Sequence, residues 1–489
     1  MNKRFANKVI SIIRNKVLFY LVSRYVTYFI QFVTSLIIAT KLGPYYMGIW
    51  GFVLLIINIF QQCHFGIAYS LPVFYVHYKD DIKKINSYIG NSLFLICGLC
   101  LLVLLIYIYY LIFGVELFDK YQINELFIWI CIIAALQYYQ TFFLQLLRVK
   151  NKILSVAFCQ SIVVFLNFVC IFFFTGIDLI YTLIAGNVIG LFACLIIAFV
   201  KLDIKDYIKI HFSIIIQRVI LKKASFLFIY GACFYFIIIS IRTIISIFYS
   251  VDEFGIFTFS FTVSHAVSLL LEAVTFLITP KILSKLSSVD LSVVCSTIQS
   301  YRQIMITSSH LLIYCLIILF PYFLIFFPKY KDAGTSLNLI SLSMLMNSNV
   351  IGYAEYMIAN NKEKILSLLS SSALVINCLL GLYLSAVLNV DFCYVILSTM
   401  FAYLVYSFSV TIYVEYFLFG NSIAHIFKNY FPIRLIIPYM LAVLLSFTSF
   451  ESFLTVVPLL VFLAGNFKQI CSLYNPVKEF LRRPEVVNI

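Results

Sequence analysis

The sequence predicts an all-α integral membrane protein with about fourteen transmembrane helices, arranged as two six-helix lobes and a C-terminal helical hairpin. Three observations support this fold class. Of the 489 residues, 63% are hydrophobic and 11% are charged, and the mean hydropathy of +1.04 excludes a soluble globular chain. The apolar residues form long runs separated by short polar turns. Short motifs of the first half return in the second half in the same order.

Fourteen apolar segments are long enough to cross the roughly 30 Å hydrocarbon core, because a helix rises about 1.5 Å per residue. They are residues 17–42, 45–70, 88–114, 125–148, 152–175, 178–200, 225–250, 252–279, 303–327, 334–360, 363–388, 392–419, 430–450 and 452–474. The first two are joined at Gly43-Pro44, and no small-x-small cleavage site follows the first, which predicts an uncleaved helix. Prolines interrupt the last two segments, so twelve spans are the alternative.

Lysine and arginine alternate from one connecting loop to the next. All but six of the 34 lie in the N-terminal segment or in every second loop after it. The exceptions are Lys41, Lys120, Lys329 and Lys331 in the opposite loops, and Arg24 and Arg242 within spans. By the positive-inside rule both termini are cytoplasmic, which requires an even number of spans. This distribution also argues that the net charge of +14 reflects membrane topology and that nucleic acid is not a partner.

The predicted organisation has four parts: an N-terminal lobe (1–200), a linker (201–224), a C-terminal lobe (225–424) and a hairpin with a basic tail (425–489). The linker carries six lysines and arginines. It also carries Ile208, Phe212, Ile215 and Val219 at helical spacing, which predicts an amphipathic helix on anionic lipids of the inner leaflet.

Three pairs of motifs relate the two lobes. They are Gly48-Ile49-Trp50 with Gly255-Ile256-Phe257 at the start of spans 2 and 8, Pro72 with Pro280 closing those spans, and Lys150-x-Lys152-Ile153-Leu154-Ser155 with Lys362-x-Lys364-Ile365-Leu366-Ser367, at offsets of 207, 208 and 212 residues. Repeats of six spans have the same orientation, so we expect a pseudo-two-fold axis along the membrane normal. Such an architecture places a substrate path between the lobes and moves substrate by alternating access.

We single out five of the charged residues within spans as candidates. Glu355 and Glu415 are about five residues from the inner ends of their spans, so we expect them to reach the surface. Arg24, Arg242 and Glu272 lie deeper, on spans 1, 7 and 8. An arginine near a helix centre costs about 2.5–3.5 kcal/mol on insertion scales and usually faces a cavity or a partner. We interpret the three as lining a shared polar cavity; snorkelling of Arg24, or an Arg24–Glu272 pair in a closed core, is the alternative.

Four uncharged or titratable side chains complete the candidate site. His64 and His265 can take part in a proton-linked step or serve as neutral packing residues. Gln31 and Gln61 can bind sugar hydroxyls or bridge helices. The candidate substrate-binding residues are therefore Arg24, Arg242, Gln31, Gln61 and His265, with Glu272 and His64 for coupling or charge balance.

No catalytic, cofactor or metal site is predicted. The sequence lacks a phosphate-binding glycine loop, a nucleophile elbow and a metal-ligand cluster. Its 13 cysteines lie in apolar runs or inner-side segments, so no disulfide framework is implied, and the metal-like spacing of Cys97 and Cys100 is assigned to packing.

Several short motifs resemble those of bacterial polysaccharide exporters of the O-antigen flippase (Wzx) type, in the multidrug, oligosaccharidyl-lipid and polysaccharide exporter superfamily. Ser23-Arg24 is also similar to a Ser-Arg pair in the first span of lipid II flippases, a sister family. The other motifs that carry the resemblance are Leu42-Gly43-Pro44-x-x-x-Gly48-Ile49-Trp50, Phe65-Gly66-Ile67, Phe254-Gly255-Ile256-Phe257 and Phe327-Pro328-Lys329-Tyr330.

The resemblance implies a flippase that moves undecaprenyl-diphosphate-linked oligosaccharide between leaflets of the bacterial inner membrane. It implies a cavity lined by spans 1, 2, 7 and 8, with Arg24 carried over as a cation for the diphosphate. It also implies a hairpin, spans 13 and 14, at the lipid tail, and a polysaccharide polymerase and chain-length proteins as partners. A cation-coupled multidrug exporter is the first alternative. A polymerase or ligase is the second, although the short outer loops disfavour it.

Overall fold

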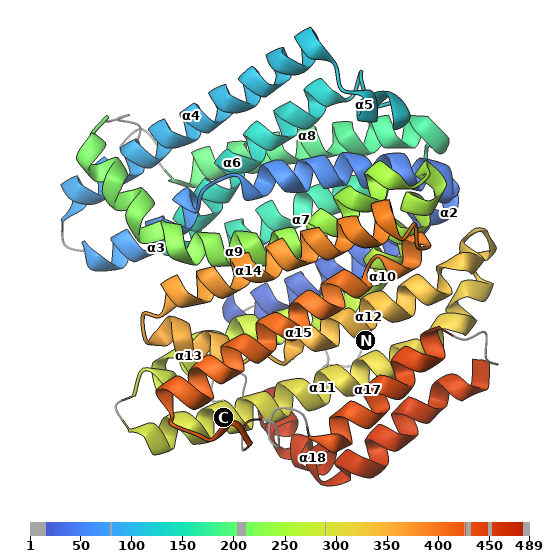
Figure 1. Ribbon diagram of the computed structural model, residues 1–489. Coiled ribbons are helices and arrows are strands. Elements are labelled where there is room, and N and C mark those ends of the chain that lie inside the picture. Colours follow the sequence, from blue (N-terminus) through green and yellow to red (C-terminus); the bar gives the residue numbers. More distant parts are fainter. Residues whose placement is uncertain are drawn as a thin grey trace, which may run out of the picture. The chain divides into compact units, whose positions relative to one another are not determined.

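The computed structural model describes residues 16–78, 81–202, 212–288, 290–424, 426, 432–447 and 452–482. Every secondary-structure element in these ranges is helical (Figure 1). The chain forms two compact units, residues 1–228 and 229–489, and the division falls within one helix. The four-part boundaries that we drew from the sequence stay predictions.

Unit 1 (residues 1–228) begins with the longest helical stretch, α2 (Lys16–Gln62), which covers the first predicted span and most of the second. Gly43 interrupts it with φ 69° and ψ 176°, a conformation open to glycine and closed to most other residues. Pro44 follows at a helix start, where a missing N–H costs nothing. The other helices are α3 (Ile67–His77), α4 (Ile82–Phe113), α5 (Glu116–Lys120), α6 (Phe127–Val149), α7 (Ile153–Cys170) and α8 (Gly176–Leu202).

The second predicted span is not one continuous helix, in contrast to our expectation for residues 45–70. It breaks between Gln62 and Ile67, where Phe65 and Gly66 have φ values of 48° and 70°. The predicted end at Pro72 is also wrong, because α3 continues to His77. In the second half, α10 (Val251–Leu286) likewise continues past Pro280. Membrane helices accept such prolines because neighbouring groups satisfy the freed backbone carbonyl.

Helix α9 (Ile214–Phe248) contains the end of the predicted linker and all but the last two residues of the predicted span 225–250 in one helix. Ile216 and Ile220 on its first turns pack against α3 and α4, whereas Ile215 is 77% exposed. The backbone N–H of Ser213 donates to Asn91 of α4, at 2.8 Å. Residues 203–211 of the linker lie outside the described ranges, so its amphipathic helix on the inner leaflet stays a prediction.

Unit 2 (residues 229–489) contains most of α9 and the remaining helices. They are α10, α11 (Leu291–Ile325), η2 (Pro328–Ala333), α12 (Gly334–Ser348), α13 (Tyr353–Ala359), α14 (Glu363–Leu382), η3 (Tyr383–Val387), η4 (Phe392–Tyr394), α15 (Leu397–Ile412), η5 (Tyr413–Leu418), α17 (Ile433–Ser446), η6 (Ser452–Val456) and α18 (Val457–Arg482). The predicted span 334–360 is broken between α12 and α13. The single turns η3 and η5 are π-helical continuations of α14 and α15.

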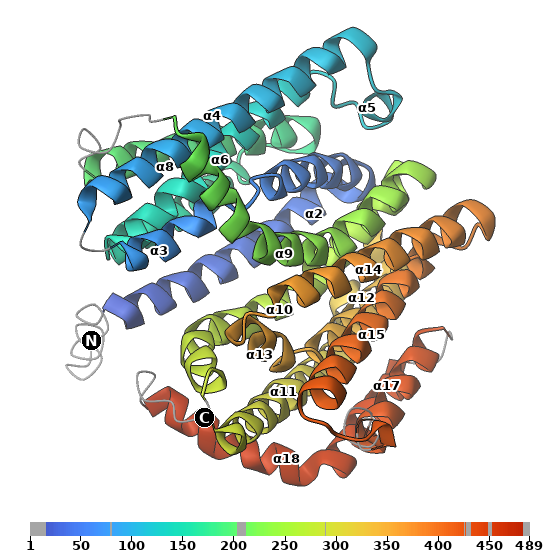
Figure 2. The ribbon, with the colours of Figure 1, turned by 60° about the vertical axis from the view of Figure 1, so that its left-hand side comes forward.

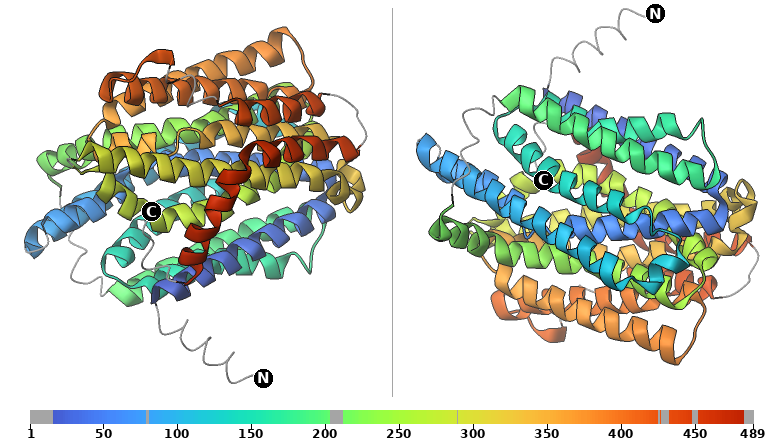
Figure 3. Two further views of the ribbon diagram at one scale, coloured as in Figure 1. Left: turned by 90° about the horizontal axis from the view of Figure 1, so that it is seen from below. Right: turned by 90° about the horizontal axis from the view of Figure 1, so that it is seen from above.

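The C-terminal hairpin is formed by α17 and α18, which pack against each other and against α12 and α11 respectively (Figure 2). Helix α18 bends at Asn466, where the backbone leaves helical dihedrals (Figure 3). The side-chain amide of Asn466 donates to the carbonyls of Arg434 and Phe462, at 3.0 and 3.1 Å. These bonds hold the bend against α17.

Ten helices of the described ranges are long and apolar enough to cross a membrane, and the apolar α17 is shorter. Helices lie in all fourteen segments that the sequence marked. The all-α membrane fold is therefore confirmed, and the protein is a multi-pass membrane protein. The span count of fourteen stays a prediction.

Candidate functional site

Arg24 lies on a polar stripe of α2 in unit 1. At about 100° per residue, Arg24, Tyr28, Gln31 and Ser35 fall within about 60° of one another around the helix. Arg24 is partly buried, donates to the Tyr28 hydroxyl, and has its guanidinium 4.5 Å from the centre of that ring. Gln31 is exposed. Apolar side chains occupy the opposite face of the same turns, where Val22, Val26 and Phe29 are exposed.

The neighbouring face of α2 is tied to α7. The Tyr20 hydroxyl donates to Oε1 of Gln160, at 3.2 Å, and the hydroxyls of Thr27 and Ser161 lie 2.8 Å apart. Thr27 is 2% exposed, so this face is closed. These contacts fix the rotation of α2 about its own axis. The stripe that carries Arg24 therefore lies next to the contact between α2 and α7.

His64 and Gln61 lie at the break between α2 and α3. His64 is buried, and its Nδ1 accepts the N–H of Gly66, at 3.3 Å, while its ring lies 5.5 Å from that of Phe228. The Tyr138 hydroxyl donates to the carbonyl of Phe60, at 2.8 Å, which satisfies an acceptor at the end of α2. Gln61 is partly buried one residue later. His64 thus has a structural contact at this break, and a role in coupling stays a prediction.

Arg242 and His265 both lie close to the ring of Phe261 in unit 2. The guanidinium of Arg242, on α9, is 5.2 Å from the ring centre of Phe261 and 6.0 Å from that of Phe254. The ring of His265 stacks on Phe261, with centroids 5.4 Å apart and an interplanar angle of 10°. Arg242 is 4% exposed, so aromatic faces supply a large part of its surroundings.

Glu272 follows His265 by seven residues on α10, which places it about 20° away around the helix. It therefore shares the helix face of Phe261 and His265, two turns further along. Its side chain lies outside the described residues. Arg24 and Gln31 thus share one stripe of α2, and Gln61 and His64 lie at the far end of that helix, beyond Gly43. Arg242, His265 and Glu272 lie on α9 and α10 in unit 2.

An amide network anchors the part of α9 that carries Arg242. The side-chain N–H₂ of Asn377, on α14, donates to the carbonyl of Ile237 at 2.7 Å and to the hydroxyl of Ser240 at 2.9 Å. Thr399 of α15 donates to the Asn377 side-chain carbonyl, at 3.0 Å. A Cβ on Gly381 would lie 2.8 Å from Ile241, so α14 and α9 approach closely here. Helices α14 and α15 therefore fix the register of α9.

Glu355 and Glu415, which we expected to reach the surface, also have partners within the protein. Both are partly buried and held by the protein. Glu355 accepts the N–H of Gly352, at 2.6 Å, and so caps α13. Glu415, on the π-helical turn η5, accepts from the Tyr353 hydroxyl at 2.5 Å and from the Asn421 amide at 2.6 Å.

Arg302 lies at the same break between α12 and α13 as Glu355. Its Nη1 donates to the carbonyls of Asn349 and Ile351, at 2.5 and 3.0 Å, and its guanidinium lies 4.0 Å from the centre of the Tyr353 ring. A cation at the end of α12 satisfies free carbonyls and opposes the helix dipole. Sequence reasoning counted Arg302 among the loop cations and missed this polar cluster. A glycine followed three residues later by glutamate was the available signal.

No group of three potential metal ligands is found among the side chains that the structure describes. Guanidinium groups in both units can donate hydrogen bonds to an anion.

Residues 13–280 match the family described as polysaccharide biosynthesis protein. This match covers more than half of the sequence. The chain belongs to the polysaccharide biosynthesis protein family. No protein in the curated collection matches the sequence significantly.

Two solved structures are similar over most of their length. One is the lipid II flippase MurJ in an inward closed conformation, with a TM-score of 0.67 and 13% identity over 94% of this chain and 100% of that one. The other is an inward-facing multidrug resistance transporter of the MATE family of the MOP superfamily. It has a TM-score of 0.58 and 11% identity over 80% of this chain and 96% of that one. At such identities the likeness establishes a shared fold.

Proposed function

We propose that this protein is a flippase of the O-antigen (Wzx) type that moves undecaprenyl-diphosphate-linked oligosaccharide from the inner to the outer leaflet. Membership of the polysaccharide biosynthesis protein family supports a role in polysaccharide biosynthesis, and the fold shared with MurJ supports a lipid-linked substrate. The proposal places the protein in a bacterial inner membrane with both termini in the cytoplasm. Within it, the polymerase and chain-length proteins act on the translocated product.

The observation that carries the proposal is the polar stripe on α2. Among the described residues, Arg24 contacts the Tyr28 phenol and has no carboxylate within ion-pair distance. A guanidinium has five N–H donors, so several stay open to a ligand. Diphosphate oxygens accept such donors in pairs, which suits an anionic lipid headgroup at membrane depth.

The other predicted residues fit the same chemistry. Arg242 supplies a second cation between aromatic rings, and the exposed amide of Gln31 can bind a sugar hydroxyl two turns from Arg24. In this proposal His265, Glu272 and His64 adjust the charge of the path, and the substrate moves by alternating access of the two lobes. The protein then acts as a transporter and catalyses no covalent step.

The test measures translocation of a fluorescent undecaprenyl-diphosphate oligosaccharide in proteoliposomes. We expect Arg24→Ala and Arg242→Ala each to lower the rate by about tenfold or more, because each variant loses one charge-assisted contact with the substrate. Arg24→Lys should recover part of the activity, because lysine keeps the charge but loses the planar fork. The matched control is Arg218→Ala, which removes an exposed arginine at the start of α9.

Wild-type translocation by both alanine variants, with equal amounts of folded protein in the membrane, would remove these arginines from the mechanism. The same vesicles test the alternative of a multidrug exporter. Efflux of a cationic dye that depends on a sodium or proton gradient, together with no lipid translocation, would favour that function.

A further inference from the structure

The part of α18 beyond the bend at Asn466, residues 467–482, is strongly amphipathic. At about 100° per residue, its Phe, Ile, Leu, Val and Tyr residues fall within an arc of about 140° around the helix, and every other residue falls outside that arc. The side chains from Leu473 onward lie outside the described residues, so these positions follow from helical spacing. Such a complete separation is typical of helices that lie in a membrane interface.

Two hydrogen bonds place this segment at the end of the membrane helices. Asn466 donates to the carbonyl of Arg434, in the first turn of α17, at 3.0 Å. The side-chain amide of Gln303, on α11, donates to the hydroxyl of Ser472 at 3.1 Å. Gln303 is the first residue of the predicted span 303–327. Both contacts lie at helix ends that the positive-inside rule assigns to the cytoplasmic side, which places the segment at that interface.

The bend turns the segment out of the direction of the hairpin. Before Asn466, α18 packs on α17, and beyond the bend the helix crosses the direction of α11 (Figure 3). At about 1.5 Å per residue, the segment is about 24 Å long. A helix that lies along the interface keeps this whole length beside lipid headgroups, with its apolar face among the acyl chains.

The contact with α11 leaves the apolar arc uncovered. Ser472, which makes this contact, lies about 150° around the helix from the centre of the arc. Phe467, at one edge of the arc, is 67% exposed. Apolar surface at the depth of the interface is removed from water when it enters the acyl-chain region. The membrane itself is therefore the partner that this face fits.

The cations of the segment share the other side of the helix. Lys468, Lys478 and Arg482 fall within about 80° of one another, and their centre lies about 130° from the centre of the apolar arc. Glu479 is the one acidic residue among them, and Arg483 follows directly in the sequence. Lysines and arginines at the depth of the headgroups attract anionic lipids, which are concentrated in the cytoplasmic leaflet.

We propose that residues 467–482 form an interfacial helix that binds the anionic phospholipid headgroups of the cytoplasmic leaflet. The apolar arc inserts among acyl chains, and the cations bind lipid phosphates. The part of α18 that crosses the membrane then ends near Asn466, within the predicted span 452–474. This surface is separate from the proposed substrate path, so its tests do not measure translocation.

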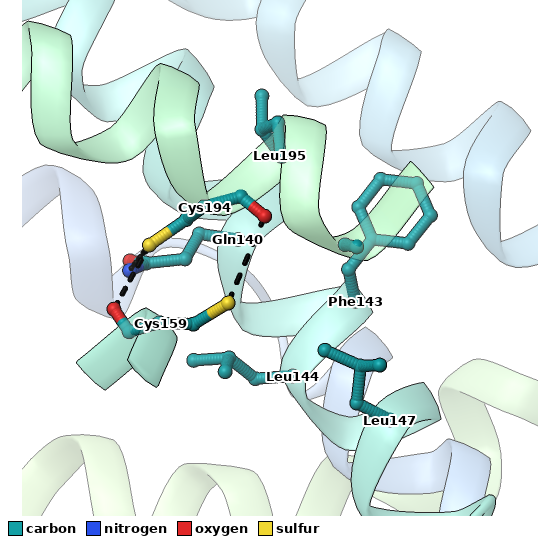
Figure 4. Close-up of a pocket in the computed structure, with 8 residues that line it drawn as sticks. Gln140, Phe143, Leu144, Leu147, Cys159, Cys194 and Leu195 are labelled. Atoms are coloured by element: carbon teal, nitrogen blue, oxygen red, sulfur yellow. Dashed lines mark hydrogen bonds between the residues drawn. The ribbon is translucent and has the colours of Figure 1, made fainter. Parts of the chain in front are cut away.

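Cys471 offers a native attachment point for a fluorophore. It is exposed and lies outside the apolar arc, on the side of the cations. Cys97 and Cys295 are also exposed and are replaced by serine. Cys159 and Cys194 can stay, because both are buried between α7 and α8 and each thiol donates to the other's backbone carbonyl (Figure 4). Peptide mass spectrometry checks that a membrane-impermeant maleimide fluorophore labels Cys471.

The test places the labelled full chain in phosphatidylcholine vesicles with a trace of nitroxide lipid. The nitroxide is carried near the headgroup by 5-doxyl phosphatidylglycerol or by 5-doxyl phosphatidylcholine. We expect at least threefold stronger quenching by the phosphatidylglycerol than by the same amount of the phosphatidylcholine. Equal quenching by the two lipids would overturn the proposal. Quenching by neither lipid would leave this face to a protein partner and would also overturn it.

A matched pair of lysine variants tests the cations. Lys468→Gln with Lys478→Gln should lower the preference for phosphatidylglycerol at least twofold. The control, Lys329→Gln with Lys331→Gln, removes two exposed lysines of η2 on the predicted outer side and should leave the preference unchanged. A preference that is equal in the two double variants would contradict binding by these cations.

A second pair tests insertion of the apolar arc. Ile470→Gln with Val477→Gln should lower quenching by 5-doxyl phosphatidylcholine at least twofold, because the arc then leaves the acyl chains. Gln469→Asn with Asn475→Gln changes two positions outside the arc and should leave quenching unchanged. Equal quenching in these two variants would contradict insertion. The comparison of the two lipids needs no substitution within the segment, so it decides the proposal even if a variant fails to fold.

Discussion

The two units each interrupt a predicted span, but they satisfy the broken backbone in different ways. In unit 1, neutral groups close the break between α2 and α3: His64 accepts the N–H of Gly66, and Tyr138 donates to the carbonyl of Phe60. In unit 2, charged groups close the break between α12 and α13. Arg302 donates to two carbonyls and Glu355 accepts the N–H of Gly352.

At both breaks, side chains bond to backbone groups that have lost their helical partners. Those side chains are neutral in unit 1 and charged in unit 2, so the charge of the partner is not fixed by the need for a hydrogen bond. A neutral partner costs little to bury, whereas a guanidinium and a carboxylate must compensate each other and the helix dipole. We therefore expect the second break to depend much more strongly on single side chains than the first.

The largest effect is expected at Arg302. Arg302→Ala removes two charge-assisted hydrogen bonds and leaves carbonyls of α12 unsatisfied, so we expect a loss of about 3 kcal/mol or more in the free energy of unfolding. Thermal unfolding of the purified protein in detergent measures the change. The free energy of unfolding of Arg302→Lys should lie between those of Arg302→Ala and wild type, because lysine keeps the charge but cannot bond both carbonyls with a planar fork.

The exposed Arg218→Ala is the control for this comparison. A loss at Arg302→Ala no larger than at Arg218→Ala would show that the carbonyls find other partners, and the contrast between the two breaks would then fail.

A glycine at each break gives the second comparison. Gly352 has φ 90°, and a Cβ there would lie 2.8 Å from Cγ of Arg302, whereas Gly66 has φ 70°. Gly66→Ala should lower the free energy of unfolding by about 1–2 kcal/mol through backbone strain. Gly352→Ala should lower the free energy of unfolding by more than Gly66→Ala does, because the added Cβ also displaces Arg302. The two melting curves measure the difference, and an equal loss at both sites would mean that Arg302 moves without cost.

The smallest effects are expected at the neutral break. Tyr138→Phe removes one hydrogen bond and keeps the ring, so we expect a loss of about 1 kcal/mol. His64→Phe keeps the contact with Phe228 and should cost a similar amount. Unfolding in detergent at low and high salt measures both variants, and their losses should not change with ionic strength because no charge is involved. A salt-dependent loss would show that charged groups also act at this break.

Much of the fold could be predicted from hydropathy, since each apolar segment that we marked contains a helix. The breaks could not. The run Cys63-His64-Phe65 is apolar enough to continue a span, and the break depends on Gly66 and on Tyr138, which is more than 70 residues away in the sequence. Pro72 and Pro280 gave the opposite error, because a proline signals a helix end only where its neighbours leave the carbonyl unsatisfied.

The candidate site was partly accessible from the sequence. Helical spacing predicts that Arg24 and Gln31 share a face of α2, and the same spacing places Glu272 with His265 on α10. The cluster of Arg302, Glu355 and Glu415 was missed, because we judged the two carboxylates by their depth along a span and did not use the Gly352-x-x-Glu355 spacing. Depth alone cannot tell whether a carboxylate meets water or the end of another helix.

The sequence by itself determined that the chain is an all-α membrane protein, because its apolar runs have the length of a membrane-spanning helix, which satisfies its own backbone hydrogen bonds in hydrocarbon. The tertiary structure alone decided where those helices break, which polar side chains close the breaks and where α18 bends. These features depend on side chains from distant segments meeting in space, and helical periodicity carries no information about such meetings.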